Sequence, residues 1–375
     1  MTKKSSPKIA IVHDWLTNMG GAENVVLAFH EAFPEAPIYT STFIPENMAP
    51  FKDLDVRTTY LQNLPKPLRK LHKLVPMLRV NAFRKLDLSE YDIILSSSSA
   101  EAKQVRKTRP NQIHICYCHT PIRYYWNDYE QYKKDPGFGK LNPLVKLLMP
   151  IMVPPLRRAD FKAAQEVDYF IGNSEYIADR IRTFYKKPAD VIHPPVNVKR
   201  FTPKKKRANY YVAMARHIPY KRLDLAISAA NKLGIKLKVF GDGSEHDKLV
   251  AMAGPTVTFH SGSRSKKNQD HITKSFNEAK GFIFPAREDF GITTVEALAG
   301  GTPVITYNQG GALDIVKDGE TGVFFSEQTT DAVAEAIQKA EKIKFNPVLL
   351  NNRAKRFDRT LFITKIKNYV FNRAK

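Results

Sequence analysis

The chain of 375 residues is longer than one ordinary hydrophobic core requires, and 43% of its side chains are hydrophobic, which excludes general disorder and favours two domains. Lysine and arginine number 59 against 37 aspartate and glutamate residues, so the formal net charge is +22. This charge predicts an anionic partner, and nucleic acid, an anionic membrane face and a phosphorylated substrate all remain open at this point.

Residues 1–192 are predicted to form a first α/β domain, because short apolar runs alternate with Gly, Ser or Asn turns and helical patterns. Its first strand is expected at 8–13 and the following helix at 21–33. The later elements are expected as strands at 91–96, 113–118 and 167–172 and a helix at 174–185. Such an alternation is typical of a parallel sheet covered by helices.

The same alternation resumes in residues 208–350, which we predict to be a second domain. Between the two domains, residues 193–207 contain three prolines and four consecutive basic residues, a composition that opposes regular structure and indicates a linker. The elements of the second domain are expected as strands at 210–215, 237–240, 257–260, 281–285 and 303–307, with helices at 222–233 and 293–300.

Two segments of the first domain interrupt this rhythm. Residues 66–85 carry seven Lys or Arg and no acid, and their pattern predicts a basic amphipathic helix kinked near Pro76. Its apolar face is expected to consist of Leu68, Leu71, Val75, Leu78 and Ala82. Residues 143–156 form an apolar run closed by two arginines, too short to span a bilayer and too rich in proline for one straight helix. Each segment either packs on its own domain or contacts an anionic membrane surface.

The remaining composition bears on the compartment and on the end of the chain. The only cysteines, Cys116 and Cys118, exclude a disulfide framework and a four-cysteine zinc site, and they fit a reducing cytosol. Residues 1–8 are not followed by an export-type apolar core, and no stretch reaches the roughly 18 apolar residues of a transmembrane helix. We therefore predict a cytoplasmic protein. Residues 351–375 are predicted to form a basic C-terminal helix.

The most informative string covers residues 285–304 and predicts a strand end, a loop and a helix that starts near Ile292 or Thr293. The backbone N–H groups from Gly291 to Thr293 and the positive end of the helix dipole would form an anion site suited to a diphosphate. Glu288 lies just before this helix and Glu296 about one turn inside it. Their carboxylates are placed to accept hydrogen bonds from sugar hydroxyls and from a ribose diol, respectively.

Glu288 and Glu296, separated by seven residues, and the Ala-Leu-Ala-Gly-Gly-Thr-Pro-Val-Ile that follows resemble the E-x7-E motif of retaining glycosyltransferases of family 4. The resemblance continues over most of the chain, in Gly-Gly-Ala-Glu at 20–23, Tyr-Cys-His-Thr-Pro-Ile-Arg-Tyr-Tyr-Trp at 117–126, Gly-Asn-Ser-Glu-Tyr-Ile at 172–177, His-Pro-Pro-Val-Asn at 193–197, Ala-Arg-His-Ile-Pro-Tyr-Lys-Arg at 215–222 and Gly-Asp-Gly at 241–243. It implies the GT-B fold, with an N-terminal acceptor-binding and a C-terminal nucleotide-sugar-binding Rossmann-like domain facing a cleft. It also implies a C-terminal helix that packs back on the first domain.

The resemblance assigns four catalytic positions. His119 would lie beside the transferred sugar, and Glu288 would position that sugar. Arg216 and Lys221 would neutralise the diphosphate leaving group, which fits a fork-shaped and a point-like cation in one loop after a strand. The family often has Gly after this lysine, whereas Arg222 stands here, which leaves the geometry of the phosphate contact open.

Further positions are expected to bind the two substrates. The donor-binding set is Gly20, Gly21, Gly241, Gly243, Phe290, Gly291, Ile292, Thr293 and Glu296, although the glycines before residue 244 could also serve their turns alone. The acceptor set is Arg123, Tyr124 and Trp126, with packing as the alternative role. His13, Asp14 and Trp15 close the first strand and are expected to face the same cleft.

Several alternatives are weaker. Asp53-Leu-Asp55 matches the metal-binding D-x-D motif of the other major glycosyltransferase fold, but it lies far from the nucleotide domain, so we expect no metal and no cofactor. Nucleic-acid binding is disfavoured because no helix-turn-helix, zinc finger or RNP-like run is present. A sugar-nucleotide epimerase and a glycan phosphorylase share the GT-B fold, but the E-x7-E motif argues against the first and the chain length against the second.

The donor and acceptor follow only from the resemblance. The strings at 117–121 and 288–292 are similar to those of bacterial mannosyltransferases of cell-surface polysaccharide assembly, which favours GDP-mannose over the alternative, a UDP-sugar. Transfer would retain the anomeric configuration by a front-face path in which the leaving phosphate helps to take the acceptor proton. We expect a glycan acceptor linked to polyprenyl diphosphate at the inner face of the plasma membrane, reached through 66–85 and 143–158, with a soluble acceptor as the alternative.

Overall fold

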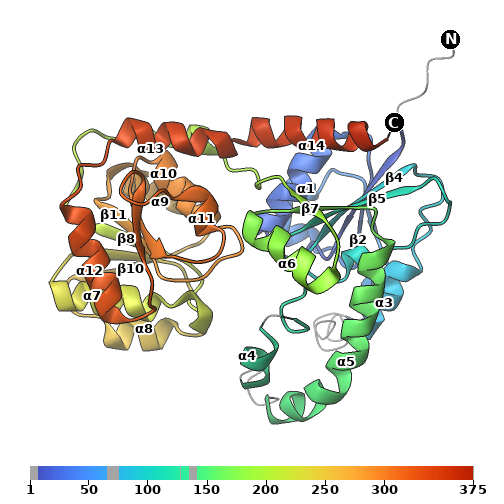
Figure 1. The fold of residues 1–375 in the computed structure, drawn as a ribbon, viewed down its shortest axis with the longest axis horizontal. Coiled ribbons are helices and arrows are strands. Elements are labelled where there is room, and N and C mark those ends of the chain that lie inside the picture. The colour runs from blue at the N-terminus through green and yellow to red at the C-terminus, as the bar shows by residue number, and fades with distance from the viewer. Residues whose placement is uncertain (1–6, 66–75, 127, 135–141, 375) are drawn as a thin grey trace. The chain divides into compact units, whose positions relative to one another are not determined.

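The computed structural model describes residues 7–65, 76–126, 128–134 and 142–374. The chain divides into two compact units, residues 1–193 together with 362–375, and residues 194–361. Each unit contains one sheet flanked by helices (Figure 1). The predicted α/β class is therefore confirmed, and each unit is described below by itself.

The sheet of the N-terminal unit has seven strands in the order β3-β2-β1-β4-β5-β6-β7. Every neighbouring pair is parallel. The strands are β1 (Ile9–His13), β2 (Ile38–Thr40), β3 (Val56–Thr58), β4 (Ile93–Ser98), β5 (Ile113–Cys118), β6 (Tyr169–Gly172) and β7 (Ala189–Val191). All residues of β1 and β4 are buried, as expected for the central strands of a sheet covered on both faces.

Helices surround this sheet (Figure 1). They are α1 (Gly21–Ala32), α3 (Pro76–Arg84), α4 (Tyr129–Lys134), α5 (Asn142–Glu166), α6 (Glu175–Tyr185) and α14 (Arg359–Arg373), with short 3-10 helices at Pro45–Asn47, Ala49–Phe51, Tyr60–Asn63 and Ala102–Gln104. From α14, Phe362, Ile366 and Val370 are buried in the same cluster as residues of α1 and the sheet. The rings of Phe29 and Phe362 stack with centroids 5.9 Å apart, so α14 completes the core of the N-terminal unit.

The predicted apolar face of the 66–85 helix is confirmed at Ala82, which is buried, and wrong at Leu78 in the part that the structure describes, which begins at Pro76; residues 66–75 lie outside it. Leu78 is 42% exposed, whereas Arg79 is only 2% exposed and forms an ion pair with Glu101. A buried carboxylate needs a cation, and this tertiary partner overrides the spacing of apolar residues.

Residues 143–156, expected to be too rich in proline for one straight helix, are helical but not straight. The segment belongs to one continuous helix of 25 residues, α5, with Pro150, Pro154 and Pro155 inside it. Figure 1 shows that α5 changes direction along its length. Each proline removes one helix hydrogen bond and bends the axis, and the packing of Met149, Val153 and Leu156 in a shared cluster stabilises the helix through these sites.

The sheet of the C-terminal unit has six parallel strands in the order β10-β9-β8-β11-β12-β13. They are β8 (Tyr211–Met214), β9 (Leu237–Phe240), β10 (Val257–His260), β11 (Gly281–Phe284), β12 (Val304–Tyr307) and β13 (Gly322–Phe325). The helices are α7 (Leu223–Leu233), α8 (His246–Met252), α9 (Lys266–Glu278), α10 (Ile292–Ala299), α11 (Ala312–Ile315), α12 (Thr330–Glu341) and α13 (Pro347–Ala354), with 3-10 helices at Val198–Arg200, Pro219–Lys221 and Lys355–Phe357.

In both sheets the strand order reverses at one place, between β1 and β4 in the first sheet and between β8 and β11 in the second. In open parallel sheets, ligands bind at the carboxyl ends of the strands beside such a reversal. The loops after these four strands are therefore the first places to look for a site. Among the described helices, none is long and apolar enough to cross a membrane.

Candidate active site

Lys221 and Glu288 meet at the strand reversal of the C-terminal unit. Lys221 ends the loop after β8, and Glu288 lies in the loop after the neighbouring strand β11. The Nζ of Lys221 donates a hydrogen bond to Oε1 of Glu288, and the two side chains are only 13% and 17% exposed. The structure therefore brings together two of the predicted catalytic residues.

The position of Glu288 is fixed by its backbone. Its carbonyl oxygen accepts a hydrogen bond of 2.9 Å from the amide of Gly311, and Glu288 and Gly310 form an isolated parallel bridge. The loop after β12 thus holds the loop that carries the carboxylate. The position of the Glu288 carboxylate is therefore set by the backbone of its loop as well as by its side-chain torsions.

Arg222 occupies the position where the family often has glycine. Its φ of 50° lies in the left-handed region, which explains why glycine is favoured there. The Arg222 guanidinium pairs with Asp224 at 3.1 Å, so this chain supports the left-handed turn with a side-chain contact. With Arg222 in this conformation, Lys221 contacts Glu288.

Arg216 lies on the same loop as Lys221, with an exposed side chain whose Nη2 donates to the hydroxyl of Tyr220 at 3.0 Å. The intervening residue, His217, is fully buried. Its amide donates to the carbonyl of Asp242 at 2.8 Å, between Gly241 and Gly243. The Gly-Asp-Gly turn after β9 therefore supports the loop that carries the two cations.

The helix α10 begins at the predicted anion site. Gly291 precedes it with a φ of +100°, a conformation that L side chains rarely adopt. The amide of Thr294 donates to the Gly291 carbonyl, so the amides of Ile292 and Thr293 come before the first intrahelical bond. Phe290 is buried and packs edge-to-face on Phe357 with centroids 5.5 Å apart, so only its backbone could meet a ligand.

Glu296 projects from the same helix toward two arginines. Its Oε1 lies 3.2 Å from Nη2 of Arg200, and the Arg264 charge also acts on it. Burial nevertheless raises the pKa of the Glu296 carboxyl, because desolvation outweighs both positive charges. Arg200 was not among the predicted site residues, and the Val-Lys-Arg that follows the linker prolines was the only signal for it.

In the N-terminal unit, His119 directly follows β5, beside the strand reversal. Its backbone is held on both sides. The His119 amide donates a hydrogen bond of 2.9 Å to the carbonyl oxygen of Ser98, and the His119 carbonyl oxygen accepts one of 3.0 Å from the side-chain amide of Asn173. Its ring Nε2 lies 2.8 Å from Oγ of Ser97 on β4. His119 is thus rigidly oriented.

Three other predicted positions of this edge, Asp14, Gly20 and Gly21, have structural roles. The Asp14 carboxylate is buried and accepts hydrogen bonds of 2.7–3.0 Å from the amides of Ser99, Ala100 and Ala102, so it shapes the loop after β4 rather than facing open solvent. Gly20 is the N-cap of α1, and Gly21 is the first residue of that helix.

All three predicted acceptor residues have internal partners for their polar groups. The Tyr124 hydroxyl donates to Glu101 at 3.2 Å and accepts from Arg79 at 3.3 Å. The Trp126 indole stacks on Phe184 at 5.3 Å, and its N–H donates to the buried Asp160 at 2.8 Å. These contacts favour the packing role for both aromatic residues. Arg123 lies 3.8 Å from Asp128.

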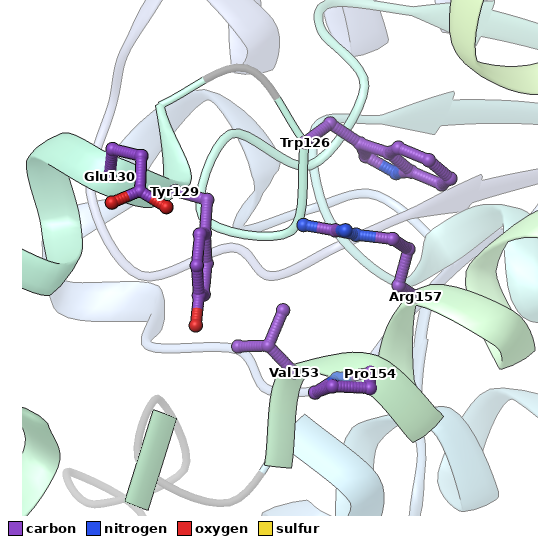
Figure 2. Close-up of a pocket in the computed structure, with 6 residues that line it drawn as sticks. All are labelled: Trp126, Tyr129, Glu130, Val153, Pro154 and Arg157. Atoms are coloured by element: carbon purple, nitrogen blue, oxygen red, sulfur yellow. The ribbon is translucent and has the colours of Figure 1, made fainter. Parts of the chain in front are cut away.

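A pocket of about 350 Å³ lies beside Trp126. Figure 2 shows the Arg157 side chain extending between Trp126 and Tyr129, and its guanidinium carbon is 5.4 Å and 5.5 Å from the two ring centroids. The pocket is lined by Trp126, Tyr129, Glu130, Val153, Pro154 and Arg157. A cation between two aromatic faces and a nearby carboxylate suit a polar ligand with hydroxyl groups.

The Asp53-Leu-Asp55 string lies in the N-terminal unit, just before β3. The Asp55 carboxylate is paired with Arg57 at 2.8 Å. Among the residues that the structure describes, no group of three or more His, Cys, Asp and Glu is arranged to hold a metal ion.

Two family models match the chain in succession. Glycosyltransferase Family 4 matches residues 19–200, and Glycosyl transferases group 1 matches residues 197–358. Among curated proteins, an uncharacterised glycosyltransferase of Methanocaldococcus jannaschii is 27% identical over 176 residues, 47% of this chain and 50% of the relative. D-inositol 3-phosphate glycosyltransferase of Mycolicibacterium gilvum is 28% identical over 211 residues, 49% of this chain and 47% of the relative. The chain thus matches about half the length of these relatives.

Solved structures of similar fold cover nearly the whole chain. Sucrose-phosphate synthase from Thermosynechococcus elongatus has a TM-score of 0.71 at 18% identity, covering 98% of this chain and 99% of its own. The lipopolysaccharide outer core galactosyltransferase WaaB has a TM-score of 0.68 at 15% identity, covering 97% and 99%. HepE from Anabaena, in complex with UDP-glucose, has a TM-score of 0.68 at 16% identity, covering 98% and 100%. At these identities the likeness shows the fold alone.

Proposed function

The chain belongs to the GT-B glycosyltransferases, with a Family 4 domain followed by a group 1 domain, and from this premise we propose that it transfers a hexose from a nucleotide-diphosphate sugar to a glycan acceptor. The contact between Lys221 and Glu288 at the strand reversal carries this proposal. A transferase must stabilise a departing diphosphate and hold the sugar at the same point, and this contact joins one group for each task.

In the proposed reaction, Lys221 and Arg216 supply positive charge to the diphosphate as the bond to the sugar breaks. The N-terminus of α10 binds the same group through the amides of Ile292 and Thr293. Glu288 then accepts hydrogen bonds from the sugar, and Glu296 from the ribose. Because two side-chain cations and a helix N-terminus serve the leaving group, we propose that transfer needs no metal. Retention of the anomeric configuration is proposed from the resemblance to the E-x7-E motif of retaining family 4 enzymes.

GDP-mannose is the proposed donor, supported by the similarity of residues 117–121 and 288–292 to bacterial mannosyltransferases of surface polysaccharide assembly. A UDP-sugar is the second candidate, since the similar structure of HepE binds UDP-glucose. A sugar-nucleotide epimerase of the same fold is the less favoured alternative. We place the reaction in polysaccharide biosynthesis on the cytoplasmic side of the membrane.

An exposed apolar face on α5 supports a lipid-linked acceptor. Leu147 and Ile151 are each 70% exposed, although Met149 and Val153 on the opposite side are buried. The exposed apolar residues follow helical spacing: Leu144, Leu147, Leu148 and Ile151. We call these four residues the α5 stripe. When a helix has apolar residues on both sides and only one side is buried, the other side exposes an apolar surface. Such a surface suits a partner that excludes water.

An anionic membrane is the partner that fits the charge of this region. Residues 142–159 of α5 contain Lys146, Arg157 and Arg158 and no acidic residue, and the whole chain carries a net charge of +22. Each basic residue near anionic lipid contributes about 1 kcal/mol of binding. In residues 76–85, the buried Arg79 is unavailable to lipid, and residues 66–75 lie outside the described part of the chain, so the membrane proposal rests on the α5 stripe.

The test of the proposed function is release of nucleoside diphosphate from GDP-mannose and from a panel of UDP-sugars, with synthetic polyprenyl-diphosphate sugars as acceptors and with a chelator present. Acceptor-dependent release of GDP, lost in Lys221→Ala, supports the proposal. Release of UDP alone supports the glycosyltransferase activity and means that the donor is a UDP-sugar and not GDP-mannose. No release from any donor contradicts the activity.

A further inference from the structure

Four polar side chains from separate segments form a continuous series of contacts at the carboxyl edge of the N-terminal sheet. Glu23 comes from α1, His13 from the end of β1, Ser97 from β4 and His119 from the residue after β5. Because β1, β4 and β5 are neighbours in the sheet, the contacts cross three strands at the strand reversal. Of these residues, only His119 is among the four catalytic positions that the family resemblance assigns.

The distances connect the four residues in order. Oε1 of Glu23 lies 3.6 Å from Nε2 of His13. Nδ1 of His13 lies 3.1 Å from the carbonyl oxygen of Ser97 and 3.1 Å from its Oγ. The same Oγ lies 2.8 Å from Nε2 of His119. Glu23, His13 and Ser97 are all buried, so water does not compete freely for these contacts.

The acceptors define where the protons lie on His13. A carbonyl oxygen can only accept, so Nδ1 of His13 donates to Ser97, and Nε2 lies at ion-pair distance, 3.6 Å, from the carboxylate of Glu23. Burial alone would lower the pKa of His13, but the hydrogen bond and charge of Glu23 outweigh it and raise that pKa. Burial would raise the pKa of Glu23, but His13 lowers it. The two residues are therefore a buried ion pair.

The Ser97 hydroxyl transmits this arrangement to His119. The Ser97 oxygen can accept from Nδ1 of His13, and its one proton can be donated to Nε2 of His119, 2.8 Å away. We infer that Glu23 and His13 are positioning residues for His119, which they hold, through Ser97, in the tautomer that carries its proton on Nδ1. The neutral His119 ring then has its single N–H on Nδ1.

This arrangement also accounts for the glycine before α1. A Cβ atom added at Gly20 would lie 2.7 Å from Oε2 of Glu23, closer than real Cβ contacts allow. In the Gly-Gly-Ala-Glu string, Gly20 thus leaves room for the carboxylate that pairs with His13. The inference rests on the proposed function for the role of His119, but the tautomer itself is independent of any activity.

The first test reads the tautomer directly by NMR of the full chain with 15N-labelled histidine, with the signals of His119 assigned by His119→Gln. The wild-type protein is expected to show an unprotonated Nε2 and a protonated Nδ1 on His119. Ser97→Ala and Glu23→Gln are expected to change this pattern. Glu31→Gln, the same substitution at an exposed position of the same helix, is the matched control and leaves the pattern unchanged.

The second test measures steady-state kinetics of the same variants. Ser97→Ala and Glu23→Gln are expected to lower kcat by about 10- to 100-fold, the range seen when a group that orients a metal-bound histidine is removed. The KM for the donor is expected to change by less than about twofold, since neither residue contacts the nucleotide in this account. Glu31→Gln should keep the wild-type kcat.

The outcomes separate the two proposals. A protonated Nε2 in the wild-type protein, or a Ser97→Ala variant with unchanged nitrogen shifts and unchanged kcat, overturns the inference. If Glu23→Gln loses its fold, Ser97→Ala decides, because it removes one oxygen atom only. If the wild-type protein transfers no sugar but its His119 tautomer responds to Ser97→Ala, the positioning stands and the proposed function fails.

Discussion

The ammonium of Lys221 contacts the carboxylate of Glu288, although the two residues are 67 positions apart and come from loops after different strands. The contact joins the two loops at the strand reversal of the C-terminal sheet. Each charge neutralises the other in the absence of donor. In the proposed reaction, an entering diphosphate gives Lys221 a second anionic partner and leaves Glu288 available to the sugar.

Replacing Lys221 with alanine is therefore expected to abolish most of the transfer without unfolding the protein. Removal of one preorganised group that stabilises developing charge costs about 10²- to 10³-fold in kcat. Release of nucleoside diphosphate measures the loss, and circular dichroism checks the fold. Lys232→Ala removes a lysine that is 54% exposed and paired with Asp331 in the same unit, and it should keep full activity. Strong activity in Lys221→Ala would contradict the assignment of Lys221 to the active site.

Substitutions of Glu288 and of Asp53 distinguish between the two glycosyltransferase motifs that the sequence resembles, E-x7-E and D-x-D. Glu288→Ala is expected to abolish transfer, because it removes the carboxylate that positions the sugar beside the diphosphate. Asp53→Ala is expected to leave activity unchanged, because Asp53 lies in the other unit. The second aspartate of its motif, Asp55, forms an ion pair with Arg57. Both variants are assayed with magnesium and with a chelator. Loss of activity in Asp53→Ala, restored by excess metal, would favour a metal-dependent mechanism.

The parallel α/β character of both units could be predicted from the sequence, because apolar runs of four or more residues mark β1, β5, β8 and β11. The strands β2, β3 and β7 have three residues each, too few for a period to show. Helix α5 was missed as one helix because its three prolines are tolerated only through packing that the sequence does not display.

The candidate site was predictable where its residues share one local motif. Lys221 and Glu288 each belong to a string with its own turn and helix start, so their loops could be identified. The pairing of Arg200 with Glu296 and of Arg79 with Glu101 could not, since each joins distant segments that meet only in the folded chain. The same holds for Glu23, His13, Ser97 and His119, which lie on four different elements.

The α5 stripe is expected to bind anionic vesicles. Leu147→Glu with Ile151→Glu places two negative charges on it and should reduce co-sedimentation with phosphatidylglycerol vesicles at least tenfold, while nucleotide binding is unchanged. Val348→Glu, an exposed apolar residue in α13 of the other unit, is the matched control. Equal sedimentation of all variants would contradict the membrane proposal. If a stripe variant instead converts a dimeric protein into a monomer, the partner of the stripe is a second copy of the chain and not the membrane.

Acid stability is expected to depend on His114. This ring is buried and hydrogen-bonded to Ser96 at 2.8 Å, and burial lowers its pKa to about 3. The unfolded chain binds a proton at this histidine near pH 6.5, so the group destabilises the fold as pH falls from about 6.5 toward 3, by up to about 1.4 kcal/mol per pH unit.

The check is denaturant unfolding of wild type and His114→Gln between pH 4 and pH 7. The raised pKa of His13 acts in the opposite direction in both proteins, so it cancels in the comparison. The variant is expected to lose less of its free energy of unfolding as the pH falls. Parallel curves for the two proteins would contradict the assignment of the acid sensitivity to His114.

The most direct measurement of the central claim is the thermal unfolding temperature with and without GDP, UDP, GDP-mannose and UDP-sugars, in wild type and in Lys221→Ala. A nucleotide at about 100 times its Kd stabilises the native state by ~2.7 kcal/mol, which raises Tm by several degrees. The account predicts a rise with GDP compounds in the wild type, without metal, that is lost in Lys221→Ala. No rise with any nucleotide, or an equal rise in Lys221→Ala, would contradict it.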